Sequence, residues 1–147
     1  MRDDGEMETY RGVVYPWHCD HMGHMNVMWY VGKFDEATWH LLGSVGLSAA
    51  WLRANGRGMV ASDQRLAYLR ELLAGDAVVV RSAILEVRGK AIRFAHRMVD
   101  AANGELCAVT QLVGVHLDTA ARRAVPLPED IAARARARVT TWTLPWD

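Results

Sequence analysis

The chain has 147 residues, with 17 basic and 17 acidic side chains and a formal net charge of zero at pH 7. A chain of this size fits one domain with its own hydrophobic core. The balanced charge argues against a nucleic-acid-binding protein and against electrostatic attraction to a membrane surface. An anionic ligand would therefore have to be bound by a local group of basic residues.

The cysteine content and the start of the chain predict a cytoplasmic protein. Cys19 and Cys107 are the only cysteines, and Cys19 lies among histidines, so a disulfide-stapled secreted scaffold is a poor description. Charged side chains replace the apolar core of a signal segment in the first residues, and no stretch reaches the roughly 18 apolar residues of a membrane span.

The first half of the chain predicts one strand and one long helix. Residues 1–8 are polar and are expected to be flexible, whereas the β-branched and aromatic residues 10–15 predict a strand. Apolar residues recur at helical spacing over residues 27–42, with Asn26 as a good N-cap and Gly43 as a good stop. Because few charges interrupt this helix, we expect it to be covered on most sides.

The rest of the chain is mostly extended. After a short predicted helix over residues 47–54, strands separated by turn residues are predicted over residues 58–73, 77–88, 91–99 and 105–117. A basic helix is then predicted to begin at Glu129, after a Pro-Leu-Pro segment.

This order of elements predicts an α+β fold, in which a helix lies on one five-stranded antiparallel sheet. We expect the domain to span residues 9–118, with residues 119–147 as a C-terminal extension that carries a short helix and packs on the same domain. Such a sheet leaves a face and an edge uncovered, and pairing two copies edge to edge would cover both. A homodimer is therefore expected, and association of two dimers into a homotetramer is left open.

Polar side chains concentrate in residues 18–26, His-Cys-Asp-His-Met-Gly-His-Met-Asn, between the end of a strand and the start of the long helix. The first backbone N–H groups of a helix lack internal partners, and they can stabilise a developing oxyanion. Asp20 is a carboxylate a few residues upstream. It could attack a carbonyl bound at the start of the helix, or it could deprotonate a water molecule that attacks this carbonyl.

Two other interpretations of this segment remain. Asp20 and the histidines could only cap the helix and satisfy the loop backbone. A metal site formed by Asp20, His21 and His24 is a weaker hypothesis, because their spacing matches no common zinc arrangement and no distant cluster completes the ligand set. We therefore expect no metal.

The run from Asp20 to Tyr30, followed by Phe34-Asp35-Glu36-Ala37, resembles the signature of hot-dog thioesterases related to 4-hydroxybenzoyl-CoA thioesterase. The resemblance continues through Tyr68-Leu69-Arg70-Glu71 and Gly75-Asp76. Within the family, the chain most resembles the small thioesterases linked to carnitine and betaine metabolism. The resemblance implies the hot-dog fold, in which the antiparallel sheet wraps around the long central helix.

The resemblance also implies an activity, the hydrolysis of an acyl-CoA thioester to the free acid and CoA, with no cofactor because CoA is part of the substrate. Asp20 matches the catalytic aspartate, as nucleophile or as general base. The backbone N–H of Val27 matches the amide that polarises the thioester carbonyl. Gly23, His24 and Asn26 match residues that let the loop turn and shape it.

Other residues are candidates for binding the substrate. Arg88, Lys90 and Arg93 cluster around a predicted turn and could contact the phosphates of CoA. Trp17 and Trp29 flank the polar segment and could hold a quaternary ammonium group through cation–π attraction, although packing is the more common role of such residues.

The chain departs from the family pattern at His18, Val27 and Thr38, which concerns specificity more than the attack on the thioester. Two functional alternatives remain. A hydratase or dehydratase of the same fold would use His24 with a distant acid, but the glycine-proline signature of that group is absent around His24. A binding module would hold acyl-CoA without turnover.

Overall fold

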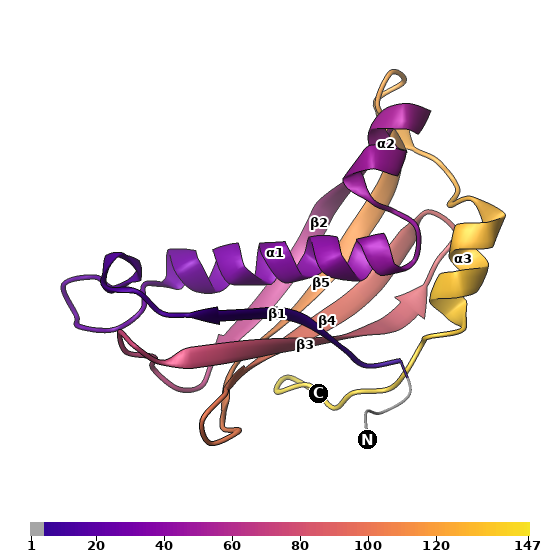
Figure 1. The fold of residues 1–147 in the computed structure, drawn as a ribbon. Coiled ribbons are helices and arrows are strands. Elements are labelled where there is room, and N and C mark those ends of the chain that lie inside the picture. Colours follow the sequence, from indigo (N-terminus) through magenta and orange to yellow (C-terminus); the bar gives the residue numbers. More distant parts are fainter. Residues whose placement is uncertain (1–4) are drawn as a thin grey trace.

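The computed structural model describes residues 5–147, so residues 1–4 of the segment expected to be flexible lie outside the described residues. A curved sheet and a long helix form the body of the molecule (Figure 1). The strands are β1 (Met7–Val13), β2 (Arg57–Tyr68), β3 (Ala77–Val87), β4 (Ala91–Asp100), β5 (Leu106–Asp118) and β6 (Arg123–Ala124). The helices are the 3-10 turn η1 (Pro16–His18), α1 (Val27–Ser44), α2 (Ala49–Asn55) and α3 (Glu129–Arg136).

The five long strands form one antiparallel sheet in the order β1-β3-β4-β5-β2, and the two-residue strand β6 pairs with the end of β5. The sheet curves around α1 (Figure 1). This arrangement confirms the predicted α+β fold with five long antiparallel strands around a helix.

The first strand is shifted toward the N-terminus relative to the prediction. It begins at Met7 rather than at Tyr10, and Met7 pairs with Ser82 of β3. The hydroxyl of Thr9 is buried and lies 2.6 Å from the hydroxyl of Ser82. A polar segment therefore joins the sheet with its threonine hydroxyl buried against a serine of β3, which the composition of residues 7–9 does not indicate.

Helix α1 begins as predicted and extends slightly further. The side chain of Asn26 accepts a hydrogen bond from Met28 N at 2.9 Å, which confirms Asn26 as the N-cap. The helix ends at Ser44 and so runs past the predicted end at Leu42 and the expected stop at Gly43. Gly46, with a φ of 105°, supplies the left-handed turn that leads the chain away from the helix.

Only one face of α1 is covered within the chain. The residues buried against the sheet are Tyr30, Lys33, Phe34, Ala37, Thr38, Leu41 and Leu42. The opposite face carries exposed apolar side chains, namely Val27, Met28, Val31 and Trp39. The expectation that α1 is covered on most sides is wrong for a single chain, because the sheet curves around one side of the helix only.

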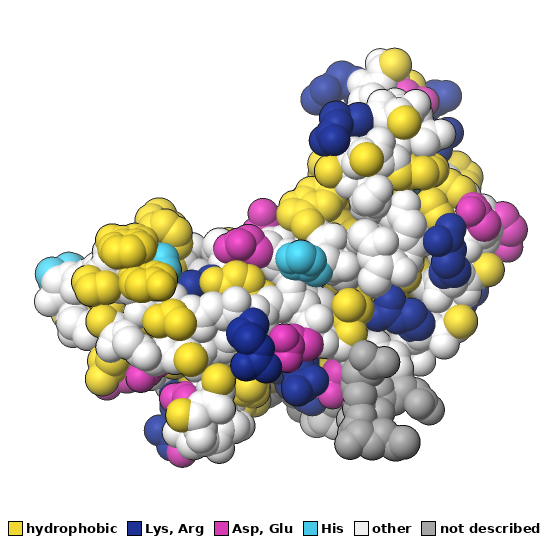
Figure 2. Space-filling model, in the orientation of Figure 1, with side chains coloured by type: hydrophobic (Ala, Val, Ile, Leu, Met, Phe, Trp, Pro, Cys, Tyr) yellow, Lys and Arg dark blue, Asp and Glu magenta, His cyan; other side chains and the backbone are white. Residues whose placement is uncertain are grey.

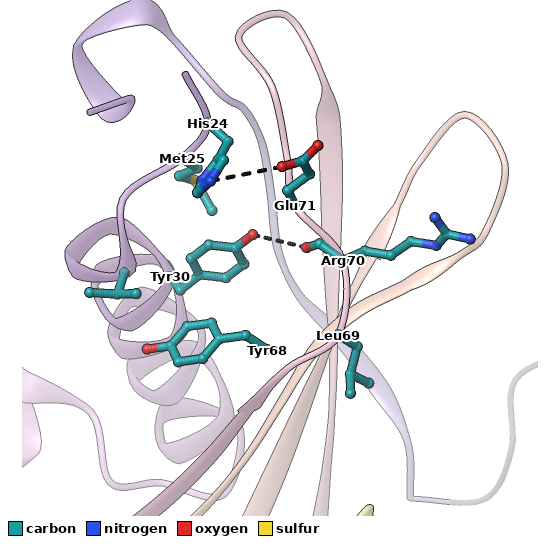
Figure 3. Close-up of a pocket in the computed structure, with 8 residues that line it drawn as sticks. His24, Met25, Tyr30, Tyr68, Leu69, Arg70 and Glu71 are labelled. Carbon is teal, nitrogen blue, oxygen red and sulfur yellow. Dashed lines mark hydrogen bonds and ion pairs between the residues drawn. The ribbon is translucent and has the colours of Figure 1, made fainter. Parts of the chain in front are cut away.

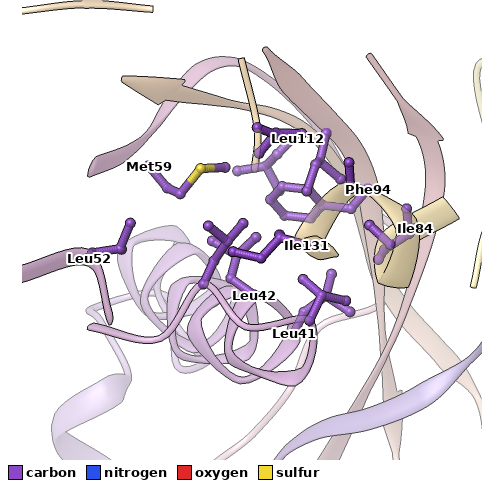
Figure 4. Packing of buried hydrophobic residues seen from close by; sticks show 14 residues of the cluster. Leu41, Leu42, Leu52, Met59, Ile84, Phe94, Leu112 and Ile131 are labelled. Atoms are coloured by element: carbon purple, nitrogen blue, oxygen red, sulfur yellow. The ribbon is translucent and has the colours of Figure 1, made fainter. Parts of the chain in front are cut away.

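The inner core has two parts along α1. Around the second half of the helix, side chains from α1, α2, α3 and the sheet pack together (Figure 4); they include Leu41, Leu52, Met59, Phe94 and Ile131. Around the first half, Tyr30, Phe34, Val80 and Met98 belong to a second cluster. These two clusters hold both halves of α1 against the sheet, and the second fixes its start.

A chain of buried polar groups links the helix to three strands. Thr38 Oγ1 donates to Phe34 O at 3.0 Å, so its oxygen is available to accept from His96 Nε2 at 2.8 Å. His96 Nδ1 then accepts from Ser82 Oγ at 2.5 Å, and Ser82 contacts Thr9. Burial lowers the pKa of His96 to about 3, so the imidazole is neutral at physiological pH. Thr38 is therefore part of the folded core as well as a departure from the family pattern.

The C-terminal segment runs back beneath the sheet after α3 (Figure 1). Trp142 and Leu144 are buried against Ala83, Leu85, Ala95 and Val109. The guanidinium of Arg97 lies 4.0 Å from the ring centroid of Trp142, within the range of a cation–π contact. The outer face of the sheet is thus covered by the chain's own last residues.

Candidate active site

The polar segment forms a tight loop between η1 and α1. Cys19 and Met25 form an isolated β-bridge across it, and Asp20 N donates to His24 O at 3.2 Å. Gly23 N donates to Asp20 O at 3.0 Å, and Gly23 adopts a φ of 86°, which favours glycine. The loop therefore folds back on itself with Asp20 at the start of its turn.

The carboxylate of Asp20 is held by hydrogen bonds on both oxygens. Oδ2 accepts from Asn26 Nδ2 at 2.7 Å, and Oδ1 accepts from the backbone N–H of Met22 at 2.9 Å. The bond from Asn26, then that from Met22, lowers the pKa of Asp20, and the nearby histidines His21 and His24 lower it further. Asp20 is therefore ionised at neutral pH, as either catalytic role requires.

Asn26 connects this carboxylate to the start of α1. Its amide nitrogen donates to Asp20, while its carbonyl oxygen caps Met28 N, and its backbone N–H donates to His18 O at 2.9 Å. Trp29 N donates to Asn26 O. Among residues 5–147, nothing accepts a hydrogen bond from the N–H of Val27, the first residue of the helix. That N–H is free to bind a ligand oxygen.

A pocket of about 270 Å³ opens beside the start of α1 (Figure 3). Its lining residues are His24, Met25, Val27, Tyr30, Tyr68, Leu69, Arg70 and Glu71. Of the predicted site residues, His24 and Val27 line the pocket. Asp20, Gly23 and Asn26 lie in the adjoining loop and are not among the lining residues.

The opposite wall of the pocket comes from a segment that was predicted to be strand. β2 ends at Tyr68 rather than at residue 73. Beyond it, Leu69 N and Arg70 N both donate to Cys107 O, at 2.8 and 3.1 Å, and Leu72 O accepts from Met25 N at 2.7 Å. The segment leaves the sheet because it hydrogen-bonds to the polar loop instead, and this brings Glu71 opposite His24 (Figure 3).

Two tyrosines form the floor of this pocket. The rings of Tyr30 and Tyr68 are perpendicular, with centroids 5.2 Å apart. Tyr30 is buried and its hydroxyl donates to Arg70 O at 3.1 Å. Burial, the largest cause, raises the pKa of Tyr30 to about 12, so its hydroxyl remains a donor. Tyr68 is 48% exposed and presents its ring to solvent.

Glu71 is the acidic group of the pocket. Glu71 Oε2 lies 3.8 Å from His24 Nε2, and its side chain is 66% exposed. The guanidinium of Arg70 points away from the pocket (Figure 3) and pairs with Glu105 at 2.6 Å. Glu71 and Tyr68 were identified in the sequence only as parts of a strand motif. Their place in a pocket depends on where β2 ends.

The basic residues expected to contact CoA lie elsewhere in the chain. Arg88 and Lys90 flank the turn between β3 and β4, and Glu86 pairs with Arg88 at 3.2 Å and with Arg93 at 3.1 Å. This turn lies at the opposite end of β3 from Asp76, whose backbone O accepts from Val14 N near the polar loop. One chain therefore does not bring these residues to the pocket, and the CoA contact stays a prediction.

Trp17 and Trp29, the residues of the expected aromatic cage, both contact the imidazole of His18. The imidazole of His18 lies between Trp29 and Trp17, at centroid distances of 4.4 and 5.7 Å. Trp17 also stacks on Tyr15 at 4.6 Å with an angle of 3° between the rings. These contacts give Trp17 and Trp29 a packing role, and their binding of an ammonium group stays a prediction.

Exposed apolar side chains gather at the end of the molecule that carries the polar loop (Figure 2). They are Tyr15, Trp17, Met22, Val27 and Met28. Within residues 5–147, no three metal-binding side chains come together, and no helix is long and apolar enough to cross a membrane.

The fold and the loop at the start of α1 define a hot-dog protein. A Staphylococcus aureus protein solved in complex with CoA superposes with a TM-score of 0.86 and 20% sequence identity, over 95% of this chain and 90% of that one. This similarity confirms the hot-dog architecture implied by the sequence motif.

The chain belongs to the thioesterase-like superfamily, whose family model matches residues 14–135. This membership confirms the expected enzyme class, an acyl-CoA thioesterase. The betainyl-CoA thioesterase of Pseudomonas aeruginosa is 26% identical over 131 residues, 89% of this chain and 82% of that protein. The L-carnitine dehydrogenase/betainyl-CoA thioesterase of Rhizobium meliloti is 28% identical over 117 residues, and the match covers 80% of this chain but 23% of that longer protein.

Proposed function

We propose that this thioesterase hydrolyses its acyl-CoA substrate with Asp20 as the catalytic carboxylate and the backbone N–H of Val27 as the oxyanion donor. One observation carries the proposal: an ionised carboxylate is joined through Asn26 to the start of a helix whose first N–H is free, beside a pocket. A thioester carbonyl bound to Val27 N–H would be polarised toward attack.

Two chemical routes fit this geometry. Asp20 could attack the acyl carbon, form a mixed anhydride and expel the CoA thiolate, after which water would release the acid. Alternatively, Asp20 could take a proton from a water molecule that attacks the same carbon. Each Asp20 oxygen accepts one hydrogen bond from the protein and keeps a lone pair for either role.

We also propose that a homodimer completes the site. The exposed apolar face of α1 and the open edge of β2 support association, because both would otherwise remain in contact with water. In such a dimer, Arg88, Lys90 and Arg93 of one copy could meet CoA bound in the other. Association into a tetramer and a cytoplasmic location stay predictions.

The experiment is a hydrolysis screen that follows release of the CoA thiol, with betainyl-CoA first because two relatives are named for it. Asp20→Asn should lower kcat by at least about 100-fold, the usual minimum for loss of a general base. Asp130→Asn removes a carboxylate from an exposed ion pair on α3 and serves as the matched control. Unchanged hydrolysis in Asp20→Asn would refute the assignment.

The same samples test the two alternatives. Hydration of an enoyl-CoA that depends on His24, without thioester hydrolysis, would indicate the hydratase. Binding of CoA thioesters without turnover of any substrate would indicate the binding module.

A further inference from the structure

The pocket beside α1 carries an uneven distribution of charge. Among its lining residues, Glu71 supplies the one carboxylate, and the one guanidinium, that of Arg70, is directed away to Glu105 (Figure 3). His24 Nε2 lies 3.8 Å from Glu71 Oε2. An acyl group in this pocket therefore meets a negative side chain.

The rest of the pocket surface is apolar and aromatic. Met25 and Leu69 contribute aliphatic atoms, and the perpendicular pair of Tyr30 and Tyr68 contributes ring surface. Tyr30 is 3% exposed and its hydroxyl is bonded to a backbone carbonyl, so Tyr68, at 48% exposed, offers most of the accessible ring surface. A carboxylate combined with tyrosine rings is the chemistry that recognises an alkylated ammonium ion.

The size of the pocket limits the ligand. About 270 Å³ is below the range of roughly 300–1,000 Å³ that holds drug-sized molecules. The free N–H of Val27 fixes where the thioester carbonyl would lie, at the wall formed by the start of α1. The remaining space is large enough for a short acyl group.

We infer that Glu71 and Tyr68 determine acyl-group specificity, and that they select short acyl groups with a positively charged, alkylated nitrogen over neutral and anionic groups of similar size. This inference rests on the proposed thioesterase function, because it places the acyl group in the pocket next to Val27. A carboxylate at this position repels dicarboxylic acyl groups as much as it attracts cationic ones.

The test compares three acyl-CoA substrates. Trimethylammonioacetyl-CoA carries the positive charge, 3,3-dimethylbutanoyl-CoA replaces the nitrogen by carbon at nearly the same shape, and succinyl-CoA carries a negative charge. The wild type should have its highest kcat/KM with the cation. Because Glu71 is largely exposed, Glu71→Gln should lower kcat/KM for the cation by roughly fivefold and leave the neutral isostere unchanged.

Two further variants sharpen the test. Glu71→Lys should reverse the order, so that succinyl-CoA becomes a better substrate than the cation. Tyr68→Leu should lower kcat/KM for the cationic substrate more than for the neutral isostere, because the substitution removes the ring but keeps an apolar side chain. Glu129→Gln, which removes an exposed carboxylate on α3, is the matched control and should change none of the ratios.

Failure of this inference differs from failure of the proposed function. If the wild type hydrolyses all three substrates with equal preference, or if Glu71→Gln leaves the cation-to-isostere ratio unchanged, the inference is wrong and the thioesterase stands. If none of the three substrates is hydrolysed, the role of Glu71 is still tested by binding. Calorimetry measures the affinity for the corresponding ketone analogues of CoA, in which the thioester is replaced and cannot be hydrolysed. Equal affinity for the cationic and neutral analogues would then overturn the inference.

Discussion

Asn26 performs two separable tasks, and serine at this position removes only one of them. The amide oxygen of Asn26 caps α1 at Met28 N, at 2.9 Å, and the amide nitrogen donates to Asp20, at 2.7 Å. Serine is also a good N-cap residue, but its side chain is too short to cap the helix and reach Asp20 together. Alanine removes both interactions.

The two variants should differ in stability. Loss of an N-cap costs about 1 kcal/mol, which for a chain of this size lowers Tm by about 2–4 °C. Asn26→Ala should therefore be about 1 kcal/mol less stable than Asn26→Ser, because both variants lose the bond to Asp20 but only alanine also loses the cap. Thermal and urea unfolding followed by circular dichroism measure both values.

The two variants should agree in their pH dependence. The bond from Asn26 is the largest cause of the lowered pKa of Asp20, so losing it raises that pKa in both variants. A lowered folded-state pKa contributes stability that is lost as the pH falls through it, and the ionised form is the catalytic one. The acid limb of kcat/KM should therefore move to higher pH in Asn26→Ser and Asn26→Ala alike.

Asn103→Ser is the matched control, because Asn103 Oδ1 also accepts from a backbone N–H, that of Glu105, in the turn between β4 and β5. It should leave the acid limb in place. An unmoved acid limb in Asn26→Ser, or a stability loss as large as that of Asn26→Ala, would refute the division of tasks.

Three further predictions concern stability. Thr38→Val removes the acceptor for His96 Nε2 and should cost about 1–3 kcal/mol in urea unfolding, whereas Thr143→Val on the exposed tail should cost little; equal losses would contradict the buried bond. Because the pKa of His96 is lowered to about 3, the unfolded chain binds the proton first, so stability should fall as the pH drops from about 6.5 toward 3, and His96→Gln should flatten that slope. Trp142→Ala should cost about 3–5 kcal/mol and expose the outer face of the sheet to the dye ANS; a cost below about 1 kcal/mol would mean that the tail is not part of the core.

The sequence predicted the elements whose signals are local. The apolar spacing and the N-cap at Asn26 located the start of α1, and the turn residues at Gly75 and Gly104 separated the strands. The polar loop was also recognisable, because Asp20, His24 and Asn26 lie within a few residues of one another.

The remaining features depend on partners that are distant in the sequence. The buried hydroxyl of Thr9 contacts that of Ser82 at an irregularity of β1, and β2 ends at Tyr68, beyond which Leu72 bonds to Met25 of the polar loop. The pocket wall formed by Glu71 follows from that early end, so no local pattern predicts it. Trp17 and Trp29 were placed correctly beside the loop, but the imidazole between them was not predictable from spacing.

The central claim is that Asp20 performs the chemical step. Single-turnover hydrolysis with enzyme in excess of acyl-CoA isolates that step from product release, and running it in heavy-oxygen water also reports any label on Asp20. We predict a rate at least about 100-fold slower in Asp20→Asn, with CoA binding retained. A single-turnover rate within twofold of the wild type would contradict the account.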